Sequence, residues 1–405
     1  MNAERVARLQ AGESYIDDVP QSEVADLLAR GRLRATTDPT AIAELDTINI
    51  CVPTPLGKSR EPDMSFVAAA LEMIAERLRP GQLVILESTT YPGTTEEMAA
   101  PLLERSGLRC GQDFHLVFSP ERIDPGNKSY PLERIPKIVG GVTPQCTQLA
   151  TLFYRQLVSE VIPVSSACTA EMVKLLENTF RIVNIGLANE LALLAGNLHV
   201  NVWEVIEAAA TKPFGFMPFF PGPGLGGHCI PVDPFYLSWK VRQNGQEAQF
   251  IELAGEINRR MPEFVVENIT AALNDHCKSV KNSRVLVLGV TYKRDVADLR
   301  ESAALDIMHL LAQRGADVAF SDPYIPSLRL GDETYVGVTL TAEELQRSDC
   351  VVIVADHSVY DWDSIVANAR AVVDTRNATR SVIGRKEHVH KLGDGSKLTP
   401  TLAMS

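Results

Sequence analysis

Long apolar runs are missing from this 405-residue sequence. No stretch approaches the roughly 18 residues of a membrane-spanning helix, and the first ten residues, MNAERVARLQ, hold no apolar signal core. Positive charge is also scarce, because 39 Lys and Arg stand against 51 Asp and Glu and give a net charge of −12. These shortages argue against a membrane-embedded protein, against docking on an anionic membrane and against a nucleic-acid-binding protein. A local basic pocket for a small anion is compatible with them.

Paired cysteines are missing as well. The seven cysteines are scattered and never form a Cys-x-x-Cys pair. This pattern favours reduced thiols over a disulfide framework or a zinc site, so we expect a cytoplasmic protein without a bound metal. The apolar content of 45% and the charged content of 22% are typical of a soluble globular protein, and the length predicts two or three domains.

Residues 1–165 alternate short apolar strands with helical patterns. The spacing of apolar residues predicts helices over 65–78 and 144–157. The predicted strands cover residues 47–53, 83–89, 114–119, 137–141 and 160–164. Alternation of strand and helix is typical of a parallel sheet covered by helices.

One long helix is predicted over residues 169–198, and it would be about 45 Å long at about 1.5 Å per residue. Such a length is typical of the spine of a helical domain or of a dimer contact. Two further helices are predicted over 233–242 and 250–273.

A second alternating region begins at residue 284, and it includes a predicted helix over 302–315. Its predicted strands cover residues 284–290, 317–322, 350–356 and 371–377. We therefore expect an α/β protein with two doubly wound parallel-sheet domains, joined by a helical domain with one long central helix. The expected boundaries are a first sheet domain at 1–165, a helical domain at 166–275, a second sheet domain at 276–382 and a mobile C-terminal tail at 383–405.

The stretch GPGLGGHCIPVDPF, residues 222–235, places Cys229 in a loop rich in glycine and proline. Glycines allow close approach of a ligand to the backbone, and prolines stiffen the loop. A buried structural cysteine is one interpretation, but free peptide N–H groups and a helix beginning near Asp233 would instead favour a reactive thiolate. Asp233 could equally be only a helix N-cap.

Lys174 and Asn178 lie four residues apart on the long helix and therefore share one face. A solvent-exposed lysine is the ordinary expectation. Apolar neighbours surround Lys174 in the sequence, and if it turns inward, the ammonium and amide groups would stabilise a developing oxyanion.

Three loops follow predicted strands, and ligands of parallel sheets bind at the carboxyl ends of strands. STTYPGTT (88–95) and SPERIDPGN (119–127, with Glu121) offer hydroxyl and carboxylate groups. GVTYKRDVADLRES (289–302) opens a helix and carries Lys293 and Arg300, which could clamp an anion. The alternatives are plain connections and a solvated charge cluster; no G-x-G-x-x-G fingerprint is present there.

Six motifs, taken in their order along the chain, resemble those of the UDP-sugar 6-dehydrogenase family. They are CVPTP, STTYPGTT, SPER, AEMVKLLENTFR, GPGLGGHCIPVDP and GVTYKRDVADLRES. The resemblance covers nearly the whole chain. The residues of GPGLGGHCIPVDP and SPERIDPGN are more similar to the branch acting on UDP-N-acetylhexosamines, such as UDP-N-acetylglucosamine, than to the UDP-glucose enzymes. It implies two Rossmann-like domains, NAD as cofactor, a UDP-sugar as substrate and a homodimer or higher homo-oligomer. The implied reaction oxidises C6 twice to the uronic acid, through a thiohemiacetal and a thioester, and supplies precursors of surface polysaccharides.

The resemblance also implies residue roles. The implied catalytic roles are the nucleophile for Cys229, oxyanion stabilisation for Lys174 and Asn178, water activation for Asp233, thioester hydrolysis for Glu121 and a part in catalysis for Thr89. The implied cofactor-binding residues are Val52, Pro53, Thr54, Ser88, Thr89 and Arg300. The implied substrate-binding residues are Glu121, Lys174, Asn178, Gly224, Gly226, Gly227, Lys293 and Arg376. The choice of sugar is expected to depend on residues 214–220.

Two departures from the family pattern stand out. UDP-glucose enzymes usually carry a second glutamate where this sequence has Pro125. The acid/base role of that second carboxylate is therefore either missing here or taken by Asp124. The opening β-α-β unit with its G-x-G-x-x-G turn, roughly thirty residues, is not found ahead of the first motif. We expect either a misplaced start or a genuine truncation, and we expect the chain as written to bind NAD poorly, to bind UDP-sugar weakly and to have little or no dehydrogenase activity. The alternatives are a UDP-glucose 6-dehydrogenase, a hydroxyacid dehydrogenase and an inactive UDP-sugar-binding paralogue.

Overall fold

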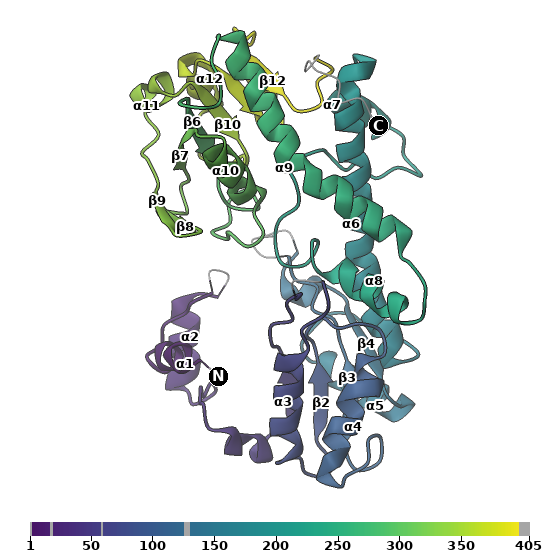
Figure 1. Cartoon of the computed structure of the whole chain (residues 1–405). Coiled ribbons are helices and arrows are strands. Elements are labelled where there is room, and N and C mark those ends of the chain that lie inside the picture. Colours follow the sequence, from purple (N-terminus) through teal and green to yellow (C-terminus); the bar gives the residue numbers. More distant parts are fainter. Residues whose placement is uncertain (1, 17–18, 58–59, 125–129, 397–405) are drawn as a thin grey trace. The chain divides into compact units, whose positions relative to one another are not determined.

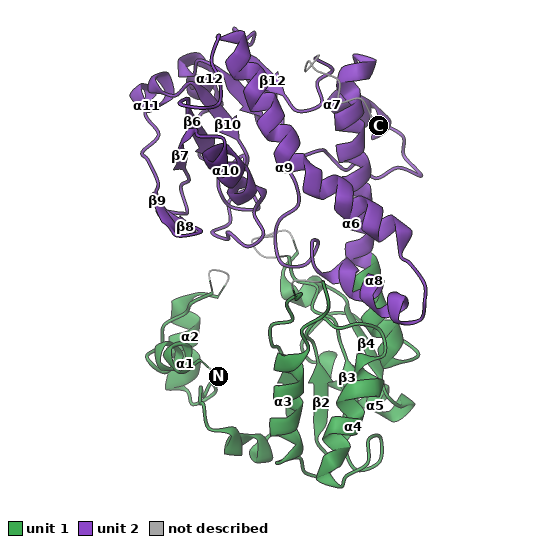
Figure 2. Ribbon diagram, viewed as in Figure 1, with its two compact units in different colours: residues 1–176 green, residues 177–405 purple. Residues whose placement is uncertain are grey.

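The computed structural model describes residues 2–16, 19–57, 60–124 and 130–396. The chain divides into two compact units, residues 1–176 and residues 177–405, which Figure 2 shows in different colours. Each unit has a five-stranded sheet of its own (Figure 1). The expected α/β fold with parallel sheets is therefore confirmed, whereas the division into three domains stays a prediction.

The first unit begins with two helices and a 3₁₀ turn, which lead into its sheet. These elements are α1 (Ala3–Gln10), α2 (Gln21–Ala29) and η1 (Pro39–Glu44). The strands are β1 (Thr47–Ile50), β2 (Leu83–Leu86), β3 (His115–Phe118), β4 (Lys137–Gly141) and β5 (Val161–Pro163), in the order β1-β2-β3-β4-β5. All five strands fall within the ranges that the sequence predicted.

One step of this sheet departs from the expected parallel pattern. Strand β4 runs antiparallel to β3, with Phe118 opposite Gly140, while the other neighbours are parallel. The described part of the connection from β3 to β4 contains only the short 3₁₀ turn η4 (Leu132–Arg134). A parallel return requires a crossover, usually a helix. The antiparallel step places Lys137, the first residue of β4, beside the carboxyl end of β3.

Helices cover both faces of the first sheet because strand side chains alternate between them. On β2, Val84 and Leu86 belong to the core formed with α3, whereas Leu83 and Ile85 belong to the core formed with α5. Thr143 caps α5 by accepting a hydrogen bond from the backbone N–H of Cys146. The helical elements between the strands are α3 (Ser65–Ala75), the π-helical turn η2 (Thr95–Ala99), α4 (Ala100–Leu103), η3 (Glu104–Ser106) and α5 (Pro144–Tyr154).

Helix α6 (Ala167–Leu198) is the long helix predicted from the sequence, and it begins in the first unit and continues through the second. Three further helices follow it, namely α7 (Val202–Ala209), α8 (Asp233–Gln243) and α9 (Gln249–Asp275). No helix of the described residues is long and apolar enough to cross a lipid bilayer.

The second sheet is parallel throughout, in the order β12-β11-β10-β6-β7. Its strands are β6 (Arg284–Leu288), β7 (Asp317–Ser321), β10 (Cys350–Ile353), β11 (Val372–Asp374) and β12 (Val389–Lys391). The order reverses between β6 and β10, which makes the carboxyl ends of these two strands the expected place for a ligand. Helices α9 and α10 (Ala303–Gln313) cover one face, and α11 (Ala342–Arg347) and α12 (Trp362–Asn368) cover the other.

The sequence did not reveal two parts of this unit. A hairpin of β8 (Ser327–Leu330) and β9 (Glu333–Val336) follows β7, and the turn η5 (Ala378–Ser381) follows β11. The expectation of a mobile tail from residue 383 is wrong for residues 389–392, because β12 pairs with β11 and the side chain of Leu392 is fully buried. The backbone carbonyl of Leu392 also accepts a hydrogen bond from the Trp203 ring. Strand β12 is short and largely polar, so no apolar pattern in the sequence indicates it, and it is identified only by its pairing with β11.

Candidate active site

In the first unit, the predicted cofactor residues gather at the carboxyl ends of β1 and β2. The hydroxyl of Ser88 accepts a hydrogen bond from the backbone N–H of Val52 at 2.7 Å and lies 3.0 Å from the carbonyl oxygen of Val52. Thr54 is buried and Thr89 is half-buried. Ser88 therefore ties the loop after β1 to the loop after β2, a structural role that the sequence did not indicate.

Glu171 of α6 holds the loop that follows Thr89. Its side chain is fully buried and accepts hydrogen bonds from the backbone N–H groups of Gly93 (2.6 Å) and Thr95 (2.8 Å) and from the Thr95 hydroxyl (2.6 Å). Burial raises the pKa of Glu171 to about 7, and these donors act in the opposite direction. Nothing in the sequence indicated this role for Glu171, although Glu171 stands three positions before Lys174 and so shares a side of the helix with it.

Lys174 turns inward, as the interpretation of an oxyanion-stabilising residue requires. Only 8% of Lys174 is exposed, and its Nζ donates a hydrogen bond to the backbone carbonyl of Glu121 at 2.8 Å. The Glu121 carboxylate is oriented by its own loop, because Oε1 accepts from the backbone N–H groups of Arg122 and Ile123, both at 2.7 Å. Asp124 is exposed, and Pro125 lies outside the described residues.

A buried charged cluster underlies Glu121. The Lys137 Nζ lies 3.5 Å from Oε2 of Glu121 and 3.3 Å from Oε1 of Glu87. Glu87 also accepts hydrogen bonds from the hydroxyl of Tyr154 and from Nδ2 of Asn49. No motif pointed to this cluster, because its members come from separate elements and none stands out in the sequence.

In the second unit, Cys229 is exposed at the end of the glycine- and proline-rich loop and forms no disulfide. The interpretation of a buried structural cysteine is therefore wrong. The carbonyl of Cys229 accepts hydrogen bonds from the backbone N–H groups of Val232 (3.2 Å) and Asp233 (2.8 Å), and this turn leads into α8. The loop thus ends in a hydrogen-bonded turn that fixes the backbone beside the thiol.

Asp233 is the first residue of α8, and Val232 occupies the N-cap position. The alternative of an N-cap aspartate is therefore wrong. The Asp233 side chain is fully buried and accepts a hydrogen bond from Nδ2 of Asn178 at 2.7 Å. The structure thus brings together two predicted catalytic residues, and Asn178 is held by a carboxylate.

The glycines of this loop are needed by the packing of the protein itself. A Cβ atom on Gly226 would lie 2.5 Å from Cβ of Tyr292, and one on Gly227 would lie 2.9 Å from the Tyr292 ring. A Cβ atom on Gly224 would lie 3.1 Å from Cβ of Ala303. The backbone at these glycines therefore lies close to Tyr292 and Ala303, and this packing explains the need for glycine without a ligand. The substrate-binding role of the three glycines stays a prediction.

The loop after β6 lies against the glycines and carries the two predicted anion-binding residues. The Thr291 hydroxyl donates a hydrogen bond to the carbonyl of Lys293 at 3.0 Å. The Arg300 guanidinium is exposed and pairs with both carboxylate oxygens of Asp298, which raises the Arg300 pKa. The structure pairs Arg300 with Asp298, and the anion-binding roles of Arg300 and Lys293 stay predictions.

A buried histidine organises this loop from below. His357 is fully buried; its Nε2 lies 3.1 Å from Oδ2 of Asp322, and its Nδ1 accepts a hydrogen bond from the backbone N–H of Asp295 at 3.0 Å. Since Nδ1 accepts, the proton resides on Nε2 and is donated to the carboxylate. The sequence did not reveal this network, whose members lie after three different strands.

Arg376, after β11, completes the predicted set. Its Nε donates a hydrogen bond to the carbonyl of Val354 at 2.8 Å, and burial lowers its pKa. A Cβ atom on Gly222 would lie 2.8 Å from Nη1 of Arg376. Arg376 therefore lies against the glycine-rich loop, in the same unit as Cys229.

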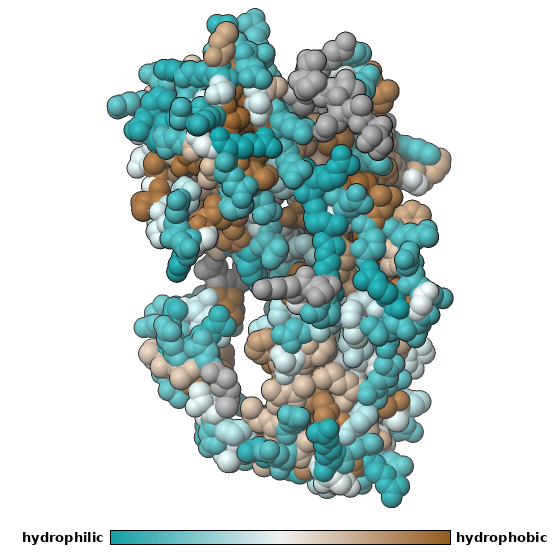
Figure 3. All heavy atoms as spheres, in the orientation of Figure 1, coloured by the Kyte–Doolittle hydropathy of each residue, from teal (hydrophilic) through white to brown (hydrophobic). Residues whose placement is uncertain are grey.

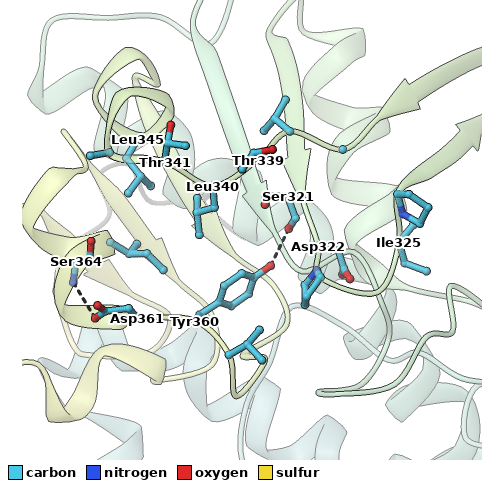
Figure 4. Close-up of a pocket in the computed structure, with 17 residues that line it drawn as sticks. Ser321, Asp322, Ile325, Thr339, Leu340, Thr341, Leu345, Tyr360, Asp361 and Ser364 are labelled. Carbon is cyan, nitrogen blue, oxygen red and sulfur yellow. Dashed lines mark hydrogen bonds between the residues drawn. The ribbon is translucent and has the colours of Figure 1, made fainter.

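A separate cavity of about 520 Å³ opens at the carboxyl end of β7 (Figure 4). Its lining includes Leu340, Tyr360 and Asp361, and the Tyr360 hydroxyl donates a hydrogen bond to the carbonyl of Ser321 at 2.8 Å. None of the predicted site residues lines it. Within the part of the chain that the structure describes, no three His, Cys, Asp or Glu side chains are arranged to hold a metal ion.

Several of the predicted site residues follow strands of the two sheets, and comparison with known proteins accounts for both sheets. Residues 1–158 match the NAD binding domain of the UDP-glucose/GDP-mannose dehydrogenase family, residues 168–260 its central domain and residues 286–381 its UDP binding domain. The chain belongs to this family, and it is an NAD-dependent oxidoreductase.

Individual relatives agree with this assignment. The UDP-N-acetyl-D-mannosamine dehydrogenase of Pyrococcus horikoshii is 36% identical over 93% of this chain and 88% of its own length. The UDP-N-acetyl-D-glucosamine 6-dehydrogenase of Pseudomonas aeruginosa is 37% identical over 80% and 76%. The solved structure of the P. horikoshii enzyme superposes with a TM-score of 0.87 at 34% identity and covers 97% of this chain and 92% of that one.

Proposed function

We propose that the protein catalyses the NAD-dependent, four-electron oxidation of C6 of a UDP-N-acetylhexosamine to the uronic acid. Relatives named for two different UDP-N-acetylhexosamines span most of the chain, and a UDP binding domain is present. The observation that carries the proposal is an exposed cysteine on a rigid loop, next to a helix whose first residue, Asp233, is bonded to Asn178.

NAD fits the first unit. The loops after β1 and β2 lie at the carboxyl edge of a parallel region and are locked together through Ser88, which is the setting of a dinucleotide site. Val52, Pro53, Thr54, Ser88 and Thr89 are the residues proposed to hold it, with Arg300 as a further contact. Bound NAD supplies the hydride acceptor for both oxidations.

The chemistry on the sugar falls to the thiol of Cys229. Its sulfur adds to the aldehyde carbon, a C–S bond forms, and the carbonyl oxygen becomes a thiohemiacetal oxygen; loss of the second hydride leaves a thioester. The carbonyl of Arg300 accepts a hydrogen bond from the N–H of Gly227, two residues before Cys229, and we propose that the Arg300 guanidinium favours the thiolate. Lys174 and Asn178, one helical turn apart on α6, are proposed to stabilise the negative charge that develops on the C6 oxygen.

Hydrolysis of the thioester needs a water molecule and a base. We assign the base to Glu121, whose carboxylate is ionisable, oriented through Oε1 and 41% exposed, and we assign the activation of water also to Asp233. Lys293 and Arg376 are the proposed ligands of the substrate's phosphate groups. Residues 214–220, which include the exposed side chains of Phe214 and Met217, are proposed to select the sugar.

The test is a stoichiometric assay on the purified chain. UDP-N-acetylmannosamine, UDP-N-acetylglucosamine and UDP-glucose are each offered with NAD, and two NADH per sugar are expected with at least one of the two N-acetyl substrates. Cys229→Ala is expected to abolish uronate formation. A single NADH per substrate, or normal turnover by Cys229→Ala, would contradict the mechanism. Preference for UDP-glucose would favour the UDP-glucose alternative, and binding without NADH would favour the inactive paralogue.

We also propose that the protein forms a homodimer through α6. In the second unit this helix exposes apolar side chains at helical spacing, and Figure 3 shows brown side chains on this part of the surface. They are Phe180 (44% exposed), Leu187 (54%), Leu191 (37%), Leu194 (42%) and Leu198 (64%). A stripe of this kind pairs with a copy of itself about a two-fold axis.

Sedimentation tests the dimer. Leu191→Glu is expected to give a monomer, whereas Glu190→Gln, an exposed neighbour on the same helix, leaves the dimer intact. An unchanged dimer in Leu191→Glu would exclude this interface.

A further inference from the structure

The cluster beneath Glu121 contains a lysine that the proposed mechanism does not use. Lys137 begins β4, and only 8% of its side chain is exposed. Burying an ammonium group is costly unless anions compensate it. Two carboxylates lie within salt-bridge distance, Glu87 at 3.3 Å and Glu121 at 3.5 Å. These two anions differ in their surroundings, and this difference suggests separate tasks.

Glu87 is the enclosed partner. Only 11% of its side chain is exposed, and it accepts hydrogen bonds from Asn49, Cys51 and Tyr154 in addition to the salt bridge. The ammonium group also lies 5.2 Å from the centre of the Tyr154 ring, within the range of a cation–π contact. Glu87 and Tyr154 therefore hold Lys137 in place from the interior of the unit.

Glu121 is the accessible partner. Its Oε1 is committed to the backbone N–H groups of Arg122 and Ile123, so Oε2, which faces Lys137, is the oxygen left for a reacting water. A fixed positive charge beside Oε2 restricts rotation of the carboxylate. A base must be both ionised and correctly oriented to remove a proton from water.

We infer that Lys137 is a positioning residue for thioester hydrolysis, which holds the Glu121 carboxylate in the orientation that water activation requires, while Glu87 compensates the charge of Lys137. The inference rests on the proposed function and deepens its last step. In that step water forms a C–O bond to the thioester carbon, its proton passes to Oε2 of Glu121, the C–S bond breaks and Cys229 leaves as thiolate. Lys137 exchanges no atom with the substrate.

Pre-steady-state kinetics tests the inference on the full chain with NAD and a UDP-N-acetylhexosamine. Lys137→Met is expected to retain a burst of two NADH per active site, followed by turnover slowed about 10- to 100-fold. Intact mass spectrometry of the quenched enzyme is expected to show the acyl adduct on Cys229. Lys137→Arg should restore most of the turnover, and Lys281→Met, which removes an exposed lysine, should behave like the wild type.

Two further variants separate the possible failures. If Lys137→Met does not fold because Glu87 is left unpaired, the pair Lys137→Met with Glu87→Gln removes both charges and is expected to show the same burst and adduct. In an enzyme that already carries Glu121→Gln, Lys137→Met should have no further effect on hydrolysis, because both act through one group.

The outcomes distinguish this inference from the proposed function. If Glu121→Gln accumulates the adduct but the lysine variants do not, the role of Lys137 is overturned and the function stands. An equal slowing of the burst and of turnover in Lys137→Met, or an added loss in the Glu121→Gln background, also overturns it. If Glu121→Gln accumulates no adduct, the proposed hydrolytic base is wrong.

Discussion

The two units hold their site loops by different means. In the first unit, buried charged side chains reach the loops: Glu171 binds the loop after β2, and Lys137 and Lys174 bind the loop after β3. In the second unit the cysteine loop is held by close packing, because Gly226 and Gly227 lie directly against Tyr292 and the N–H of Gly227 bonds to the carbonyl of Arg300. The first arrangement is electrostatic and the second is steric, so the two should respond differently to pH and to added volume.

The largest effect is expected from Gly226→Ala in the second unit. The new Cβ atom would lie 2.5 Å from Tyr292 Cβ and 3.0 Å from the carbonyl oxygen of Glu301, so backbone must move. We expect a loss of about 3 kcal/mol in the stability of the loop, with the same loss at pH 6 and pH 8, because no charge is involved. The measurement is the affinity for UDP at both pH values by calorimetry.

Gly57→Ala is the control, because the nearest atoms there belong to the flexible end of Glu61. An affinity for UDP in Gly226→Ala that equals the wild type would show that the packing is not what holds this loop.

A smaller, pH-dependent effect is expected from Glu171→Gln in the first unit. The pKa of Glu171 is raised to about 7 in the folded protein against 4.5 for the unperturbed group. Between these values the folded state binds the extra proton, so the stability of the wild type falls as pH rises through this window, by about 1.4 kcal/mol per pH unit. Gln does not titrate, and the variant should lack this slope. Melting temperatures measured from pH 4.5 to pH 8 check it.

Glu190→Gln, exposed on the same helix, is the matched control and should keep the slope of the wild type. Parallel melting curves for the wild type and Glu171→Gln would mean that Glu171 stays ionised throughout, as its hydrogen-bond donors alone would favour.

The smallest effect is expected from Ser88→Ala. This variant sharpens the comparison because Ser88 is a neutral residue in the first unit, where charged side chains hold the loops. Loss of the hydrogen bond from the N–H of Val52 should cost about 1 kcal/mol, with no dependence on pH. The measurement is the affinity for NAD at pH 6 and pH 8. A pH-dependent loss would show that the whole edge of the sheet, and not its charged residues, responds to pH.

The sequence alone predicted the regular elements and the family. Local patterns predicted strands β1 to β7, the long helix α6 and the ordered motifs, because apolar periodicity and glycine–proline loops are properties of neighbouring residues. The antiparallel direction of β4 was not predicted. The exposed Cys229 and the inward Lys174 agree with the reactive-thiol and inward-lysine interpretations of those motifs. The pairing of Asn178 with the Asp233 carboxylate was not predicted and comes from the structure.

The remaining features depend on contacts between distant residues. Strand β12 exists through β11, Glu171 binds a loop more than 70 residues away, and Lys137 meets Glu87 only because β4 reverses direction. The sequence therefore predicts which residues carry the chemistry, since their types and spacing are local, and their roles stay predictions. The tertiary structure specified which buried groups hold them, since a buried charge is tolerated only where the fold supplies its partner.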